Sequence, residues 1–179
     1  MEKEIVARGP GVFDELLSYS NIVFRICLGF SANPHVAEEL YQEVYLKAWS
    51  DIGSLRNKDS AKPWLLKIAR NTSLNHLRKK RSDGRLYSEG EFPLVERNTP
   101  EAVVLRKERH QILKDAVRRL PKKYRVVFVL REYGQLSYEE IAGTLGVKTG
   151  TVMSRLNRAR RAITDRLKEK GYGTQDTGK

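Results

Sequence analysis

Arginine side chains gather on the polar face of a helix that is expected to follow Gly146. A serine hydroxyl and an asparagine amide lie among them in the N-terminal half of that helix. The polar residues of this face are Ser154, Arg155, Asn157, Arg158, Arg160 and Arg161. Guanidinium groups bind phosphate oxygens and the edge of guanine, and small polar groups bind base edges. This set favours a helix that reads bases with its N-terminal half and holds phosphates with flanking cations. A solvated basic helix in an ordinary bundle is the alternative.

The segment before these arginines has the signals of a helix-turn-helix. Ser137 and Glu140 have the S-x-x-E spacing of a capping box, in which each side chain bonds the backbone of the other residue. Gly146 then allows a tight turn, and Thr149 or Thr151 can cap the next helix. The buried stripe of that helix is predicted to comprise Val152, Leu156, Ala159, Ile163 and Leu167. Helix, short glycine turn and helix together indicate DNA binding.

Positive charge is concentrated in separate segments of the 179-residue chain, whose net charge is +12 and whose pI is near 9.9. Residues 1–55 have a net charge of −4, residues 56–81 of +8, and residues 82–105 of −3. Residues 106–144 then carry +5 and residues 145–170 carry +6. Two basic regions on either side of an acidic one fit two contacts with a phosphate backbone. Solubility alone is the alternative explanation of the charge.

The residues that could support enzymatic chemistry lack the required spacing. His35, His76 and His110 are far apart, so no histidine metal motif is expected, and Cys27 is the only cysteine. Cys27 lies in an apolar stretch and is expected to be buried. The sequence has no phosphate-binding glycine loop and no nucleophile elbow. We therefore expect no enzyme, no catalytic residue, no metal and no cofactor.

Helical periodicity dominates the N-terminal part of the chain. A first helix is expected over roughly residues 10–30, with Phe13, Leu16 and Leu17 on its apolar face. Asn33 and Pro34 then resemble an N-cap followed by proline at the first helical position, and Gly53 ends this second helix. Ser60 is predicted to cap a third helix that ends in the basic run at residues 78–81.

Residues 82–104 break the helical pattern with two glycines and two prolines, which indicates a linker. Helices resume near residue 101, and only the run Val126–Leu130 is ambiguous between helix and strand. The predicted fold is all-α, with two small helical domains joined by a flexible linker. Their expected boundaries are residues 1–81, a linker at 82–105, residues 106–170, and a tail at 171–179.

The N-terminal residues lack a basic segment followed by an apolar core, so we expect no signal peptide. No run of 18 apolar residues occurs, so no membrane insertion is expected. A cytoplasmic location is predicted.

Four segments resemble the sigma-70 superfamily of bacterial RNA polymerase sigma factors, in particular the extracytoplasmic-function (ECF) group. Residues 37–49 (AEELYQEVYLKAW) resemble region 2.2, and residues 63–81, which begin PWLLKIARN, resemble region 2.4. Residues 120–125 (LPKKYR) and 150–155 (GTVMSR) resemble region 4. The resemblance covers about residues 10–170 in family order, with a linker where the family has one. It implies a sigma factor that binds core polymerase, recognises −10 and −35 promoter elements, and supports promoter melting.

The resemblance also implies functional residues in the N-terminal domain. Asn71 matches the asparagine that lines a pocket for a base flipped from the −10 element, and Leu55 matches a residue that packs on that base. Backbone contacts there are implied for Lys58, Lys62, Lys67, Arg70 and Arg78. The region 2.2 helix is implied to dock on the clamp helices of the largest polymerase subunit through Gln42, Glu43, Leu46 and Trp49. Local structural roles are the alternative for Asn71, Leu46 and Trp49.

In the C-terminal domain the resemblance implies −35 binding by Lys148, Thr151, Met153, Ser154, Arg155, Arg158 and Arg160. Met153 departs from the family, which usually has Lys or Arg there, and Val147-Lys148-Thr149 lack the proline that often precedes this motif. Both departures bear on which −35 sequence is read. The implied partners are core RNA polymerase, through its clamp helices and flap, promoter DNA, and an anti-sigma factor.

Two other classes of protein compete with this interpretation. A helix-turn-helix regulator would explain residues 120–168 but would leave the block Trp64–Arg81 unexplained. A nuclease or recombinase would need a catalytic or metal-binding set, and Glu38, Glu39 and Glu43 more readily form a solvated or partner-facing helix edge.

Overall fold

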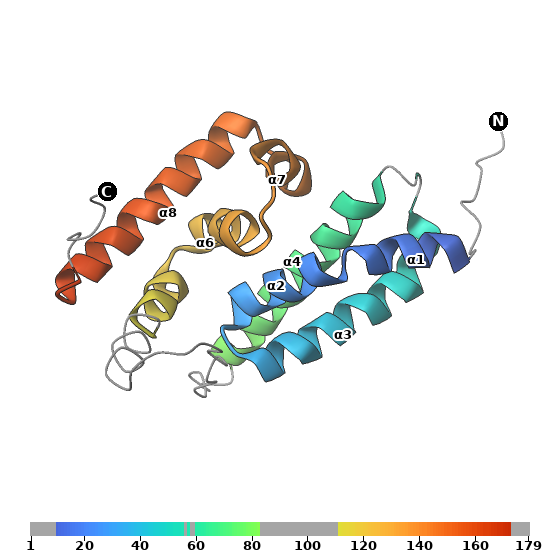
Figure 1. Ribbon diagram of the computed structural model, residues 1–179, viewed down its shortest axis with the longest axis horizontal. Coiled ribbons are helices and arrows are strands. Elements are labelled where there is room, and N and C mark those ends of the chain that lie inside the picture. Colours follow the sequence, from blue (N-terminus) through green and yellow to red (C-terminus); the bar gives the residue numbers. More distant parts are fainter. Residues whose placement is uncertain (1–9, 56, 58–59, 83–110, 173–179) are drawn as a thin grey trace, which may run out of the picture.

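The chain folds into packed helices, as the periodicity predicts. The structure, a computed structural model, describes residues 10–55, 57, 60–82 and 111–172, and within these ranges every regular element is helical (Figure 1). The all-α prediction is confirmed. Lys58 and the predicted linker beyond Ser82 lie outside the described residues.

Residues 10–82 form an N-terminal helical unit of four helices. These are α1 (Pro10–Ser18), α2 (Ser20–Ser31), α3 (Pro34–Asp51) and α4 (Ala61–Ser82), with a short 3-10 turn, η1 (Ile52–Ser54), after α3. Helices α2, α3 and α4 pack on one another, and α1 contacts α2 and α4. Their apolar stripes meet in a core that includes Leu16, Val23, Ile26, Cys27, Leu40, Val44, Leu65 and Leu66.

The single helix expected over residues 10–30 is two helices. Tyr19 separates them with backbone angles of φ −91° and ψ 7°. Within α1, Leu16 is buried, whereas Leu17, which was assigned to the same face, is 41% exposed. Neither proline nor glycine marks this position, so the sequence had no breaker signal there.

Local capping signals place the start of α3. The Asn33 side chain accepts hydrogen bonds from the backbone of His35 and Val36 at 2.9 and 3.2 Å, and Pro34 follows it, as predicted. Ser60 behaves differently from the cap that was expected, because its hydroxyl donates to the carbonyl of Asn57 at 2.7 Å.

Residues 111–172 form a C-terminal helical unit. Residues 111–119 are helical, and α6 (Lys122–Phe128) continues into a π-helical turn, η3 (Val129–Tyr133). The ambiguous run Val126–Leu130 is therefore helical. Helices α7 (Tyr138–Leu145) and α8 (Thr149–Glu169) complete the unit, and α8 packs on both α6 and α7.

The helix-turn-helix signals are largely confirmed. The Ser137 hydroxyl accepts from the Glu140 amide at 3.1 Å, and the Ser137 amide donates to the Glu140 carboxylate at 2.7 Å. Gly146 ends α7 in the left-handed conformation, with φ 64°. The threonine cap is wrong: α8 begins at Thr149 with Lys148 as its N-cap residue and without a capping side-chain hydrogen bond. On the α8 stripe, Val152, Leu156, Ala159 and Ile163 are buried.

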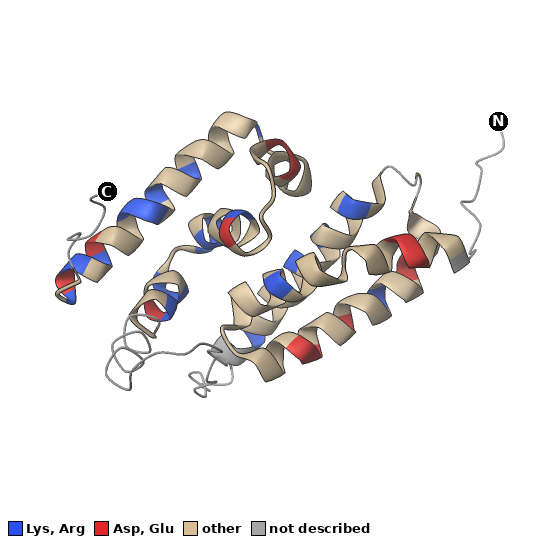
Figure 2. Ribbon diagram, viewed as in Figure 1, with Lys and Arg blue, Asp and Glu red and all other residues tan. Residues whose placement is uncertain are grey.

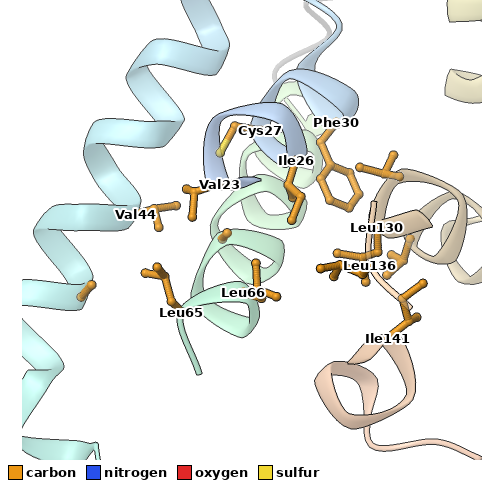
Figure 3. Packing of buried hydrophobic residues seen from close by; sticks show 14 of the residues in the cluster. Val23, Ile26, Cys27, Phe30, Val44, Leu65, Leu66, Leu130, Leu136 and Ile141 are labelled. Carbon is orange, nitrogen blue, oxygen red and sulfur yellow. The ribbon is translucent and has the colours of Figure 1, made fainter. Parts of the chain in front are cut away.

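The two helical units share one hydrophobic core. Ile26 and Phe30 of α2 lie beside Leu130, Leu136 and Ile141 of the C-terminal unit (Figure 3). Helix α2 packs on η3, and α4 packs on α7. A second, smaller cluster belongs to the C-terminal unit alone and consists of Ala116, Val117, Leu120, Ala159 and Ile163. The units therefore meet through apolar side chains in the same way as helices within one unit.

Candidate nucleic-acid interface

Helix α4 presents the first candidate surface. Lys67, Asn71 and Arg78 are exposed, and Arg70 is half-buried. The Asn71 side-chain oxygen accepts from Nε and Nη2 of Arg70 at 3.1 and 2.9 Å, while Nη1 of Arg70 donates to the Thr144 carbonyl at 3.0 Å. Burial lowers the pKa of the Arg70 guanidinium. The surface therefore combines exposed cations with an amide that is held in place by a neighbouring arginine.

Two other residues expected in this surface have partners elsewhere. Lys62 is ion-paired with Glu140 of α7, and its ammonium lies 6.0 Å from the centre of the Tyr19 ring. Leu55 is only 3% exposed and packs in the shared core, so in this arrangement its side chain contributes to packing. Contact between Leu55 and a base would require the residues around it to move.

Helix α8 and the residue before it present the second candidate surface. Lys148, Met153, Ser154, Arg158 and Arg160 are exposed. Thr151 and Arg155 are half-buried. Figure 2 shows basic residues along α8 and α4, and acidic residues on α1 and α3 as well as on α7 and toward the C-terminal end of α8. The sequence-predicted −35 residues thus lie on α8 and on the residue before it, outside the buried stripe of that helix.

Two α8 arginines are held by side chains that the sequence did not single out. Nη1 of Arg158 donates to the Tyr124 hydroxyl at 3.3 Å, and this hydrogen bond lowers the pKa of the tyrosine. Nη2 of Arg160 lies 2.9 Å from a carboxylate oxygen of Glu132, a hydrogen bond that raises the pKa of the arginine. Both partners come from α6–η3, at least 28 positions earlier, so local spacing had no signal for them.

The two candidate surfaces approach each other at a groove between the helical units. Arg70 and Asn71 of α4 line it from one side, and Arg155 of α8 lines it from the other. The remaining lining residues are Leu74, Pro121, Lys122, Lys123, Val126 and Leu145. Four of the nine lining residues are cations and none is acidic, so the groove is cationic with an apolar floor.

Helix α3 carries an exposed apolar pair. Leu46 is 70% exposed and Trp49 is 63% exposed, which rules out the core role that was the alternative for them. The Trp49 ring stands edge-on to Phe13 with centroids 5.0 Å apart, so it is supported from one side. Gln42 and Glu43 are exposed beside them, with Glu43 paired to Lys47. Polar residues around an apolar pair are typical of a protein-binding surface.

No group of three or more histidine, cysteine, aspartate or glutamate side chains suited to a metal ion occurs among the described residues. Within the same ranges, no helix is long and apolar enough to cross a membrane.

Family models match both helical units. The family model for Sigma-70 region 2 matches residues 16–83, and that for Sigma-70 region 4 matches residues 110–163. The RNA polymerase sigma-H factor of Pseudomonas aeruginosa is 34% identical over 92% of this chain and 91% of its own length. The ECF RNA polymerase sigma factor SigW of Bacillus subtilis is 30% identical over 84% of this chain and 86% of its own length.

Solved structures share the fold. The sigma factor RpoE of Bartonella quintana, in complex with the anti-sigma factor NepR, matches with a TM-score of 0.65 and 27% identity, covering 87% of this chain and 95% of that one. CnrH in complex with the cytosolic domain of CnrY matches with a TM-score of 0.64 and 20% identity, and the match covers 90% of this chain and 91% of that one.

Proposed function

Because the chain belongs to the ECF group of the sigma-70 superfamily, the transcription initiation factors of bacterial RNA polymerase, we propose that it brings core polymerase to promoters through two DNA contacts. The N-terminal unit, within residues 1–81, binds core polymerase and the −10 element. The C-terminal unit, within residues 106–170, binds the −35 element with α8. Sigma factors are a non-catalytic class of subunit, and no reaction is assigned to the chain itself.

The observation that carries this proposal is the exposed apolar pair on α3. Leu46 and Trp49 expose most of their side-chain surface on a helix whose other apolar residues are buried or partly buried. Leaving such groups in water is unfavourable by roughly 25 cal/mol per Å² of apolar area, so a protein partner is expected to cover them. A DNA-binding regulator needs no such pair, whereas a subunit that docks on polymerase does.

Promoter recognition follows from the chemistry of α4 and α8. Asn71 offers an amide NH₂ that donates to the edge of a base extruded from the −10 element, while Lys67, Arg70 and Arg78 hold phosphates. Extruding a base costs a few kcal/mol of stacking, which these contacts offset during melting. On α8, Arg155 and Arg158 are the candidates for base edges in the −35 element, with Lys148 on the backbone. An anti-sigma factor is proposed as a further partner, since the matched RpoE of Bartonella quintana is in complex with the anti-sigma factor NepR.

Run-off transcription tests the proposal. Core polymerase is incubated with the chain on a library of genomic fragments, and the start sites are mapped. The expected result is initiation at a defined set of promoters sharing −10 and −35 sequences. If initiation is unchanged when the chain is omitted, the proposal is wrong and the chain is better explained as a DNA-binding regulator.

A further inference from the structure

Helix α8 exposes one large apolar side chain outside its buried stripe. Met153 is 47% exposed, and within the described residues 111–172 no other large apolar side chain is exposed. The thioether side chain has no charge and no hydrogen-bond donor, so it offers little to a phosphate group. A single exposed apolar residue is ordinary on a protein surface. Its neighbours on the helix therefore decide whether Met153 has a role.

Asn157 lies one turn further along the same side of α8. Residues four apart on an α-helix have Cβ atoms about 5–6 Å apart, so the side chains of Met153 and Asn157 are neighbours. Asn157 is exposed, and within the part of the chain that the structure describes its side chain forms no hydrogen bond. The resemblance to the family assigned it no role. An amide that is free both to donate and to accept thus lies next to an apolar group.

The polar side chains around this pair are arranged differently. Arg158 and Arg160 are held by residues of α6–η3, and the Ser154 hydroxyl donates to the Thr151 carbonyl at 3.0 Å. Asn157 breaks no such bond when it approaches a base. Exposed cations lie before and after the pair, at Lys148 and Arg161. Cations that hold phosphates on both sides would place the pair between them over the base edges.

The major groove of DNA offers a partner for each group. Adenine presents the N7 acceptor and the N6 amino donor, and an asparagine amide can bond both at once. Thymine presents its C5 methyl group, against which an apolar side chain packs. Four residues of helix rise about 6 Å, which is close to two base-pair steps of about 3.4 Å. One position of α8 can therefore bring both side chains to their bases.

We propose that Asn157 and Met153 determine the sequence that α8 reads, by selecting an adenine and a thymine that lie within two base pairs of each other. The inference rests on the proposed function for the assignment of α8 to the −35 element. Recognition of the two bases requires only that α8 enters a major groove. It therefore holds equally for a regulator that acts without polymerase.

Selection from random DNA identifies the preferred sequence. A duplex library with a randomised segment is bound by the full chain alone and by the chain with core polymerase, and the retained duplexes are sequenced. We expect the duplexes retained in at least one selection to share an adenine and a thymine at this spacing. Enrichment of no sequence in either selection, or of sequences without these bases, overturns the inference.

Modified bases then remove one group at a time from a selected duplex. 7-Deazaadenine lacks the N7 acceptor of adenine, and it is expected to weaken binding by about three- to tenfold. Uracil lacks the methyl group of thymine, and it is expected to weaken binding by about fourfold. A modified duplex that binds as tightly as the unmodified one overturns the role of the residue proposed to read that base.

Variants assign each effect to its residue. Asn157→Leu has nearly the same shape without a hydrogen-bonding group, so it should bind adenine and 7-deazaadenine duplexes equally while still preferring thymine to uracil. Met153→Gln should show the opposite pattern, whereas Met153→Leu remains apolar and should retain the preference for thymine. Asn21→Leu, at an exposed position of α2, is the matched control and should retain both preferences. Circular dichroism verifies that helical content is unchanged in all four.

Two results of these titrations bear on different conclusions. If both base preferences persist in Asn157→Leu and Met153→Gln, other residues read these bases and the inference is overturned. If the preferences are lost as expected but run-off transcription shows no initiation that depends on the chain, only the proposed function is wrong. The two failures are distinguishable because the titrations measure binding of the full chain to DNA, not initiation.

Discussion

The side-chain oxygen of Asn71 accepts two hydrogen bonds from the Arg70 guanidinium, at 3.1 Å from Nε and 2.9 Å from Nη2. Arg70 in turn donates to the Thr144 carbonyl. The amide of Asn71 is thus oriented by an arginine that also contacts the other helical unit. Separation of the units would change the geometry of the residue proposed to read a flipped base.

Asn71→Ala is expected to impair promoter opening while leaving initial DNA binding intact. The amide carries no charge, so salt-dependent binding should persist, whereas a base contact worth about 1–3 kcal/mol is lost after melting. Permanganate footprinting measures the opening. A template with a pre-melted −10 region should restore much of the activity, because the stacking cost is already met. Asn21→Ala, at an exposed position of α2, is the control; opening by Asn71→Ala at the wild-type level would leave Asn71 a structural residue.

Leu46→Ala is expected to weaken binding to core polymerase by about tenfold, which corresponds to about 1.4 kcal/mol. Its side chain is 70% exposed, so the thermal midpoint of unfolding should stay near that of the wild type. Leu17→Ala, on α1 and 41% exposed, is the matched control. Fluorescence titration with core polymerase measures the difference, and equal affinities for both variants would contradict docking through α3.

Arg158→Ala is expected to reduce affinity for the −35 element by about 1–3 kcal/mol if the arginine pairs with a base. Tyr124→Phe removes the hydroxyl that binds Arg158 at 3.3 Å, so it should cause a smaller loss in the same direction. Competition binding with promoter and scrambled duplexes separates the two roles of the arginine. An equal loss on both duplexes would reassign Arg158 to the phosphate backbone.

Met153→Arg is expected to strengthen DNA binding and to steepen its salt dependence. The side chain is 47% exposed on the proposed DNA face of α8, so the substitution adds one cation beside the phosphates. Each additional phosphate contact changes the slope of log K against log[salt] by about −0.9 on duplex DNA. DNA titration at several salt concentrations measures the slope. An unchanged slope would show that residue 153 lies away from the phosphate backbone of the DNA.

The pH dependence of stability is expected to report the burial of Cys27. Burial raises the pKa of this thiol from its ordinary 9.0 to about 11 in the folded chain. The folded state therefore holds the proton more tightly than the unfolded state, and stability falls as the pH rises from about 9 to about 11. In urea unfolding, the free energy of unfolding of Cys27→Ala should fall less between pH 8 and pH 10.5 than that of the wild type. If the free energy of unfolding falls equally in both proteins, groups other than Cys27 account for the pH dependence.

Local signals in the sequence were sufficient for most of the secondary structure, whereas the candidate site residues came from the resemblance to the family. Asn33, the Ser137–Glu140 capping box and Gly146 act within a few residues of themselves, so their effect can be read without knowing the fold. The buried stripe of α8 follows from helical periodicity in the same way. Most of the candidate residues named by the family motifs lie on α3, α4 and α8.

Tertiary structure alone decided which of these residues meet. The break at Tyr19 has no local breaker, and the burial of Leu55 depends on helices that pack around it. Lys62 and Glu140 are separated by 78 positions, and each has an ordinary local role, as a cation near a helix start and as a capping residue. Gly29 has no turn to form, and its lack of a side chain matters only because Tyr133 lies against it. Periodicity fixes which face of a helix is apolar, but the partner of that face is chosen by the packing of the whole chain.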